Sequence, residues 1–435
     1  MVGKPKIRLS LEGWLKNAAF ISLIDQVIVS GSALLVISLI GSQLGSESLG
    51  IYSLITSLLV FSGCIQTSLV MTPWTIAFAS TGNDELKRRQ ALRALLGSFA
   101  ISIGFTLLFS TLAFFSPNPS IKQLLFMTAF CVVPVLFREF IRRFDFARMH
   151  MVNALRWDTL FAISYVGSVF VLINADIDGP LPVLLAWAMV SAVLSFAWFA
   201  LGNAKLFQVH GWCEAQPFSS WSHRKWFLVE QACWTATLYA LHWITYGTLS
   251  IHETGILAAS MTIASLLSPI WQGAGNFLSP KLAAQVGEGS RSETWSLLKK
   301  ATLLLALLGL SFLAIVAVAG EFLLNLLFDG EFQGSGYLVS MLTLRMCLFA
   351  LRVPVLHTLF ALRAPHFAAY SSGVALAIMI VLGFPLASLE GLKGVAVASV
   401  ISASTDLLVS TVLLGLRFHS WRWNQPGSCG EACLA

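Results

Sequence analysis

Long apolar runs alternate with short polar intervals along almost the whole chain of 435 residues. A helix needs about 20 mostly apolar residues to cross the hydrocarbon core of a bilayer, and twelve runs are long enough. The pattern predicts an all-α polytopic membrane protein with twelve transmembrane helices. The expected spans are 17–40, 50–79, 94–115, 121–137, 154–172 and 181–201 in the first half, and 227–249, 255–282, 301–320, 337–359, 367–387 and 395–416 in the second.

The second half can be laid over the first, which indicates an internal duplication. Residues 23–26 and 228–231 open the two halves and read Leu-Ile-Asp-Gln and Leu-Val-Glu-Gln. Because six is an even number, both halves start on the same side of the membrane. We therefore expect two six-helix lobes related by a pseudo-two-fold axis along the membrane normal, with the pathway between them. Further matches in chain order are Gly50 with Gly255, Thr72-Pro73 with Ser279-Pro280, and Arg138 with Arg352.

The polar intervals set the expected domain boundaries. Residues 202–226 form the longest polar interval between spans and contain Gln-Pro and several serines, as flexible linkers do. The expected parts are a cytoplasmic N-terminal segment 1–16, a first lobe 17–201, the cytoplasmic linker 202–226, a second lobe 227–416 and a cytoplasmic tail 417–435.

Lysine and arginine are concentrated in alternate loops, whereas most loops between them are acidic. Arg142, Arg143 and Arg148 form one of the basic groups and are interpreted as loop residues. Positive loops stay in the cytoplasm, so both termini are predicted to be cytoplasmic. The net charge of +6 is spread over many short loops, and we expect no nucleic-acid binding.

Composition excludes most other classes of protein. The hydrophobic fraction is 57%, the charged fraction 11% and the mean hydropathy +0.78, far from the values of soluble domains. The sequence lacks the phosphate loop, the H-E-x-x-H helix and the G-x-S-x-G elbow, and its outer loops are short. We therefore expect a transporter and not an enzyme. Neither a metal nor another cofactor is expected, because the spacing of Cys429 and Cys433 matches no strong zinc pattern.

Asp25 and Glu230 occupy equivalent positions near the start of the first helix of each half. A carboxylate inside a membrane costs about 2.5–3.5 kcal/mol, and such groups usually face a cavity. Both acids are candidates for coupling transport to H⁺ or Na⁺, or for hydrogen bonds to substrate sugars; the alternative is a structural pairing with a nearby arginine. Asp406 on the last helix is a third coupling candidate. Gln26 and Gln231, beside the two acids, are candidate substrate contacts.

Arg345 and Arg352 are seven residues apart on the tenth helix, so they share one face. A guanidinium is always charged and its planar fork suits phosphate oxygens. Together with Arg138 on the fourth helix, these arginines are candidate ligands for an anionic substrate. The alternatives are a structural pair of Arg345 with an acid, and snorkelling of Arg138 and Arg352 to lipid headgroups.

Other intramembrane residues receive structural interpretations. Arg156 and Asp158, close to the start of the fifth helix, are interpreted as interfacial. Pro73, Pro280 and Pro354 predict kinks, because proline removes a helical hydrogen bond.

The segments that carry a family resemblance are 24–26, 30–32, 44–45, 49–54 and 138–148. On these residues the chain resembles bacterial polysaccharide-biosynthesis (Wzx-like) oligosaccharide flippases of the multidrug, oligosaccharidyl-lipid and polysaccharide exporter superfamily. The family's lipid II flippase branch carries two further helices, so the chain is not expected in that branch.

The resemblance implies a V-shaped pair of lobes around a cationic cavity that opens alternately to either side of a bacterial inner membrane. A polyprenyl-diphosphate-linked oligosaccharide for O-antigen, capsule or exopolysaccharide would cross there, with its tail in the membrane lipids. Arg345 and Arg352 would bind the diphosphate, and Asp25 would couple. Implied partners are a polysaccharide polymerase or glycosyltransferases. The alternative function is a cation-coupled antiporter of the multidrug and toxin extrusion type, although such a cavity would be richer in acids.

Overall fold

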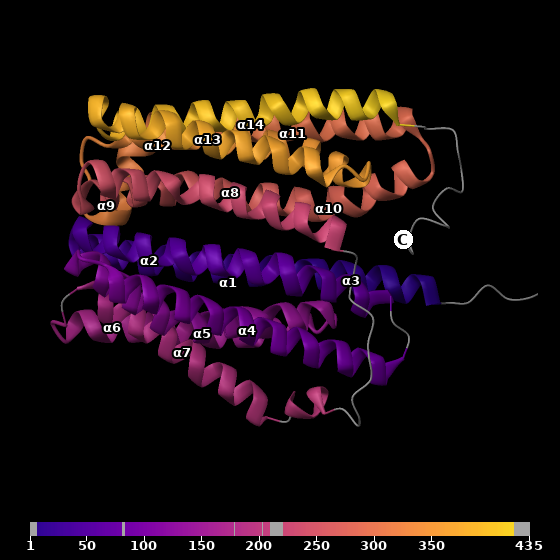
Figure 1. The fold of residues 1–435 in the computed structure, drawn as a ribbon, viewed down its shortest axis with the longest axis horizontal. Helices are drawn as coiled ribbons and strands as arrows, with labels where there is room; N and C mark the ends of the chain where they lie inside the picture. Colours follow the sequence, from indigo (N-terminus) through magenta and orange to yellow (C-terminus); the bar gives the residue numbers. More distant parts are fainter. Residues whose placement is uncertain (1–6, 81–82, 178, 202, 209–220, 422–435) are drawn as a thin grey trace, which may run out of the picture. The chain divides into compact units, whose positions relative to one another are not determined.

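The computed structural model describes residues 7–80, 83–177, 179–201, 203–208 and 221–421, all of it helix, turn or short connection, with no strand in these ranges (Figure 1). The segment 1–6, much of the expected linker and the tail beyond residue 421, with Cys429 and Cys433, lie outside the described residues. The α-helices are α1 (Ile7–Gln43), α2 (Gly45–Gln66), α3 (Thr72–Ser80), α4 (Asp84–Phe115), α5 (Pro119–Ala147), α6 (Met151–Asn174), α7 (Pro180–Ala200), α8 (Trp221–Thr248), α9 (Ile251–Ala264), α10 (Ser268–Gly287), α11 (Arg291–Phe328), α12 (Gly336–Ala361), α13 (Pro365–Glu390) and α14 (Leu392–Ser420).

These helices confirm the predicted all-α membrane fold. A π-helical turn, Thr67–Met71, joins α2 to α3, and a 3₁₀ turn, Ser265–Leu267, joins α9 to α10, so twelve long segments result. Eleven of them are both long and apolar enough to cross a membrane. The twelfth, α8, has 28 residues and a length of about 42 Å at 1.5 Å per residue. Tryptophans, threonines and histidines lower the mean hydropathy of α8, but the helix is still long enough to cross a bilayer.

Only one of the three prolines expected to kink a helix lies beside a break in a helix, and the kinks at Pro280 and Pro354 stay predictions. Pro73 follows the π-helical turn and lies in the first turn of α3. The eighth span breaks beside Pro269, in the first turn of α10, and not at Pro280, which α10 contains internally. Pro354 also lies inside one continuous helix, α12. A helix tolerates proline where a neighbouring group binds the backbone carbonyl that proline leaves without its hydrogen bond. It also tolerates proline in its first turn, where the backbone N–H has no partner within the helix.

The fourth span is longer than its apolar run. The run ends at Phe137, but α5 continues to Ala147, so Arg138, Arg142 and Arg143 are helical residues and not loop residues. The expectation that Arg142 belongs to a loop is therefore wrong. Helix geometry brings Arg138 and Arg142, four residues apart, onto one face of the extension.

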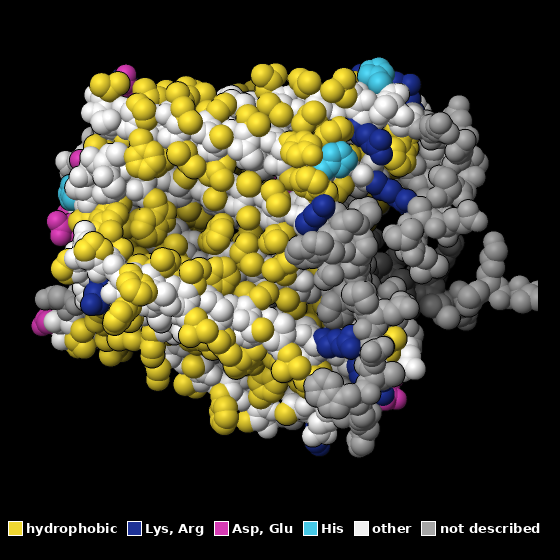
Figure 2. Space-filling model, in the orientation of Figure 1, with side chains coloured by type: hydrophobic (Ala, Val, Ile, Leu, Met, Phe, Trp, Pro, Cys, Tyr) yellow, Lys and Arg dark blue, Asp and Glu magenta, His cyan; other side chains and the backbone are white. Residues whose placement is uncertain are grey.

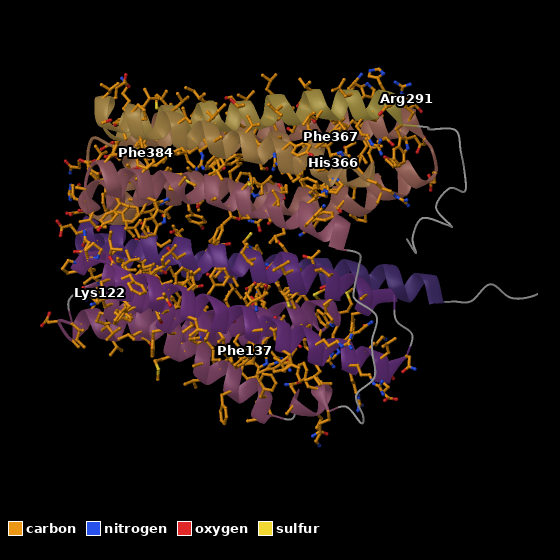
Figure 3. All side chains as sticks on the ribbon, in the orientation of Figure 1. Lys122, Phe137, Arg291, His366, Phe367 and Phe384 are labelled. Carbon is orange, nitrogen blue, oxygen red and sulfur yellow. The ribbon has the colours of Figure 1, made fainter. Side chains whose placement is uncertain are left out.

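By packing, the chain forms two units: residues 1–39 with 69–218, and residues 40–68 with 219–435. The first unit has an aromatic core where α3, α5 and α7 meet. Trp74 stacks on Phe144 with 5.2 Å between ring centroids, and Trp198 meets Phe144 edge-on at 5.8 Å. Phe137, labelled in Figure 3, stacks on Phe199 at the margin of this core. Large rings fill the space between helices that small residues would leave open.

In the second unit α2 packs on α8 and α9, so α2 groups by packing with helices of the second half. The two expected lobes, residues 17–201 and 227–416, are derived from the internal duplication of the sequence. Their boundaries stay a prediction. Gly50 of α2 and Gly255 of α9 make the close approach, because a Cβ on Gly50 would meet the carbonyl of Ile251 and a Cβ on Gly255 the carbonyl of Ser46. Small residues let membrane helices approach in this way.

Large hydrophobic side chains lie exposed along the sides of the helices, as expected for a surface that faces lipid (Figure 2). Val318 is 89% exposed and Phe196 76% exposed, which would be costly in water. Within each unit, lysine and arginine gather mainly toward one end of the helices. This distribution is the one that the positive-inside rule describes.

Candidate functional site

Each unit contains a buried cluster of ionised side chains. In the first unit the cluster joins α1, α5 and α6. Arg142 donates from Nη2 to Oδ2 of Asp25 at 2.9 Å and from Nε to Oδ2 of Asp158 at 2.7 Å. Arg138 donates to the other oxygen of Asp158 at 2.6 Å and covers the ring of Phe161 at 3.5 Å. Two arginines therefore neutralise two carboxylates.

Burial explains why these groups pair. Asp25 and Asp158 are 1% and 3% exposed, and a buried charge needs a partner because water no longer solvates it. Asp158 is therefore a partner in an internal ion pair, and its interpretation as an interfacial residue, which concerns its depth in the membrane, stays a prediction. A cavity beside Arg138, Arg142 and Asp158 has about 20 Å³ of space, room for little more than one water. This cavity has no room for a ligand larger than water.

In the second unit the cluster joins α8, α12, α13 and α14. Both terminal nitrogens of Arg352 donate to Oε1 of Glu230, at 3.2 and 3.1 Å, and its Nε lies 2.9 Å from Oδ2 of Asp406. The hydroxyl of Ser372 accepts a further bond from Arg352 at 2.7 Å, and Gln231 donates to Oε2 of Glu230 at 3.0 Å. One arginine here serves two carboxylates.

The two clusters repeat one arrangement. In each, an arginine on the fourth helix of the half binds the acid on the first helix of the half and a second acid elsewhere. Arg142 has this role in the first half and Arg352 in the second. The sequence alignment of the two halves matched Arg352 with Arg138. The residue with the equivalent contacts is Arg142, one helical turn further along α5. The second acid is Asp158 on the fifth helix in one half and Asp406 on the sixth in the other.

A cavity of about 270 Å³ opens beside the second cluster, formed by α8, α10 and α12. Arg352 and Glu230 lie in its wall, so an ion or ligand in the cavity would reach the cluster. Gly275 allows α10 to approach α12, because a Cβ there would meet Nε2 of His357. The polar and aromatic lining residues are Glu230, Gln231, Trp234, Trp271, Gln272, Asn276, Phe349, Arg352 and His357.

Arg345 lies apart from this cluster, although it shares a helix face with Arg352. Its side chain is fully buried, and its Nη2 donates to the backbone carbonyls of Thr237 at 3.0 Å and Leu238 at 3.3 Å. The guanidinium also covers the ring of Phe349 at 4.9 Å. Among the described residues no carboxylate lies within ion-pair distance of Arg345. The alternative interpretation, a pairing of Arg345 with Glu230 or Asp406, is therefore wrong, and Arg352 pairs with both acids instead.

The two candidate glutamines differ in their surroundings. Gln26 donates to Ser30 one turn further along α1, at 3.3 Å. Gln231 lines the cavity beside Glu230. Their predicted roles as substrate contacts stay predictions.

Sequence reasoning missed Arg142, Asp158 and Ser372. A signal for the first two exists in hindsight: Arg138, Arg142 and Asp158 can all lie on facing helix surfaces once the fourth helix is extended by three turns. Ser372 gives no signal, because serine is common in membrane helices and usually bonds its own backbone.

No protein-family model matches the chain, and no curated protein resembles it in sequence. Solved structures do resemble it. A MATE-family multidrug-resistance transporter of the MOP superfamily, in an inward-facing conformation, is 14% identical and has a TM-score of 0.64 over 91% of this chain and 94% of its own. A MOP-superfamily transporter from Pyrococcus furiosus is 12% identical, with a TM-score of 0.64 over 93% and 96%.

The lipid II flippase MurJ, in an inward closed conformation, is also similar: it is 12% identical, with a TM-score of 0.65 over 92% of this chain and 89% of its own. At these identities the likeness concerns the fold. The chain is a multi-pass membrane protein with the fold of MOP-superfamily transporters, as the resemblance implied. Its place among the polysaccharide flippases stays a prediction.

Proposed function

We propose that this protein is a flippase that moves a polyprenyl-diphosphate-linked oligosaccharide across a bacterial inner membrane by alternating access. The observation that carries the proposal is the cavity of the second unit, where amide and indole side chains surround a wall that contains Arg352. Amides donate and accept hydrogen bonds as sugar hydroxyls do, and indole rings present apolar faces to sugar rings. The fold shared with MurJ and with MATE transporters supports transport.

The second cluster suggests how a diphosphate and a coupling ion would exchange. Arg352 forms ion pairs with Glu230 and Asp406. These three residues include two carboxylates and one guanidinium, so one carboxylate is in excess. A proton or Na⁺ on these acids would weaken their hold on the guanidinium, which would then be free to bind phosphate oxygens. Release of the ion would restore the pairs and displace the phosphate. Binding of the ion and of the substrate is thereby linked.

Asp25 is the coupling candidate of the first unit. Among the described residues its buried Oδ1 has no hydrogen-bond partner, while Oδ2 binds Arg142. An arriving proton would lie on that free oxygen and loosen the contact with Arg142. Arg345 is assigned to the diphosphate only after a rearrangement that releases it from the carbonyls of α8. Both termini are assigned to the cytoplasm, where glycosyltransferases or a polymerase would meet the protein.

Lipid-linked oligosaccharide in proteoliposomes tests the proposal directly. Purified protein is reconstituted with a fluorescent polyprenyl-diphosphate oligosaccharide, and a membrane-impermeant glycosidase reports the fraction accessible outside. We expect wild-type protein to expose the inner pool, and Arg352→Ala to abolish that exposure. Arg143→Ala is the matched control, because Arg143 pairs with Glu139 outside the cluster. Equal accessibility with and without wild-type protein would exclude flipping.

A cation-coupled antiporter is the second candidate, and the excess carboxylate beside the cavity favours it, since cationic substrates need acids. Uptake of a fluorescent cationic dye by inverted vesicles separates the two. Dye accumulation that depends on Glu230, in protein that leaves the oligosaccharide in place, would favour the antiporter.

A further inference from the structure

A groove of about 1090 Å³ runs along the second unit between α11 and α14, with α12 as its floor. Both α11 and α14 pack extensively on α12. Leu351 and Val355 of α12 line the bottom, so a molecule in the groove would contact three helices. The groove does not include Glu230, Arg352 or Asp406, and the proposed function does not use it.

Small side chains keep the groove open. Thr302 and Ala306 of α11 face Thr411 and Gly415 of α14. A Cβ on Gly415 would meet no atom within 4 Å, so the position borders open space. The wall residues of α11 recur every three or four positions, which makes them one helix face.

One end of the groove is cationic and aromatic. Arg291, labelled in Figure 3, begins α11 and donates from Nη2 to Nδ1 of His419 at 3.3 Å. The ammonium of Lys299 lies 5.0 Å from the ring of Trp295, and that ring meets Phe418 at 5.6 Å. Among the described residues no carboxylate lies within 4 Å of Arg291 or Lys299. Their charges are therefore available to an anion. Since arginine always donates, Nδ1 of His419 accepts, which leaves its Nε2 as a further donor.

The length of the groove matches one leaflet of a membrane. From Arg291 to Ala306 the helix rises about 22 Å at 1.5 Å per residue. One leaflet has about 15 Å of hydrocarbon and about 5–7 Å of headgroup. An anionic headgroup at the basic end would thus leave an acyl chain beside Leu351 and Thr302. With the headgroup at Arg291, Trp295 one turn further along α11 would lie at the boundary between headgroups and hydrocarbon, where tryptophan is enriched.

We propose that this groove binds a phospholipid with an anionic headgroup, with the phosphate at Arg291, Lys299 and His419 and an acyl chain between α11 and α14. A polyprenyl tail is disfavoured as the occupant, because it is far longer than one leaflet. The bound lipid would fill space that the three helices leave between them and would hold α11 to α14.

Native mass spectrometry of the full-length protein, titrated with phosphatidylglycerol or with phosphatidylcholine in detergent, tests the proposal. We expect wild-type protein to retain phosphatidylglycerol in preference to phosphatidylcholine. The double variant Arg291→Ala with Lys299→Ala should bind phosphatidylglycerol about 30-fold more weakly, since each basic side chain near an anionic headgroup contributes about fivefold. Raised salt should weaken binding by wild-type protein more than by this variant.

A second variant tests the apolar part without changing charge. Gly415→Leu should fill the groove and reduce retention of phosphatidylglycerol, whereas Gly167→Leu, at an exposed position of α6 with open space around it, should not. Equal retention by wild type, the double variant and Gly415→Leu would overturn the proposal. Equal binding of the two phospholipids, or displacement of phosphatidylglycerol by stoichiometric polyprenyl phosphate, would overturn it too. These readouts do not depend on transport.

Discussion

Arg352 and Arg142 each hold two carboxylates that the protein has removed from water. A buried pair gains little over an apolar replacement, but a charge left alone costs several kcal/mol. Keeping such clusters is therefore more easily explained by function than by stability. In the second unit the cluster borders a cavity and contains a single arginine among the residues that the structure describes, whereas in the first Arg138 pairs with Asp158 and balances the charge.

Replacement of Arg352 by glutamine should separate charge from volume. The change leaves Glu230 and Asp406 buried together without a cation, and we expect a loss of about 3–5 kcal/mol in stability. Adding Glu230→Gln and Asp406→Asn should recover most of that loss without restoring transport. Thermal unfolding in detergent, followed by size-exclusion chromatography, measures the first effect. Unchanged melting of the single variant would contradict the pairing.

Asp158→Asn should loosen the first cluster, because both Arg138 and Arg142 lose a charged acceptor. Hydrogen bonds to charged groups contribute about 1.5–3 kcal/mol each, so we expect a clear drop in the melting temperature. Asp84→Asn is the control, since the side chain of Asp84 is 93% exposed and pairs loosely with Lys87. Equal melting of the two variants would contradict the pairing of Asp158 with the two arginines.

For single residues, the sequence predicted the acids of the two clusters better than the residues that pair with them. Asp25, Glu230 and Asp406 were recognisable because charge is rare in apolar runs, and all three are buried. Arg142 was not, because it lies beyond the apolar run of its helix, where charge is ordinary. Asp158 was not, because it lies only four residues inside the expected start of its span, where a charge is easily interpreted as interfacial. Depth along a helix depends on where the helix ends, and hydropathy gives no such end for α5.

Among the elements, α2 and α9 show how the repeat serves packing. The matched glycines Gly50 and Gly255 were found as a repeat signal, and they lie at one close approach of two helix backbones. The hydroxyl of Ser46 and Nδ1 of His252 are 2.5 Å apart nearby, and Trp243 donates to Ser57 at 2.9 Å. Close backbone contact and a few polar bonds replace the hydrophobic effect, which does not drive association between helices in lipid.

Gly255→Ala should therefore destabilise the second unit. The new methyl would meet the backbone of Ser46, which cannot rotate away as a side chain would, and overpacking costs about 1–3 kcal/mol or more. Gly247→Ala on α8 is the control, since a Cβ at Gly247 has open space. The melting temperature in detergent is the measurement. A variant as stable as the control would show that α2 and α9 can separate without cost.

Eleven of the twelve expected spans are confirmed as helices long and apolar enough to cross a membrane, because the length and apolarity of such a helix can be read from the sequence. The crossing by α8 stays a prediction. The breaks within the spans could not be predicted. The turn at Ser265–Leu267 lies beside Pro269, whereas Pro280 and Pro354 sit inside continuous helices. Proline removes one helical hydrogen bond in either place, and neighbouring groups can supply other partners for the carbonyl that it leaves free, so that the helix need not end there.

At the scale of the whole molecule, the prediction of twelve crossings depends on α8, which has to cross the membrane despite its modest hydropathy. If it does, the chain crosses an even number of times and both ends lie on the same side, which we predict from the loop charges to be the cytoplasm. Fusions of a cytoplasm-active fluorescent protein and of a periplasm-active phosphatase to each end should both report the cytoplasm. An active phosphatase at one end only would mean eleven crossings.

The most direct measurement follows the lipid-linked oligosaccharide in the host itself. In cells that lack this protein, we expect the oligosaccharide to accumulate on the cytoplasmic face of the inner membrane. Wild-type protein should relieve the accumulation, whereas Asp25→Ala, Arg352→Ala and Arg345→Ala, each confirmed to be present in the membrane, should not. Normal glycan export in the deletion strain, with altered sensitivity to cationic drugs, would contradict the flippase and favour an antiporter.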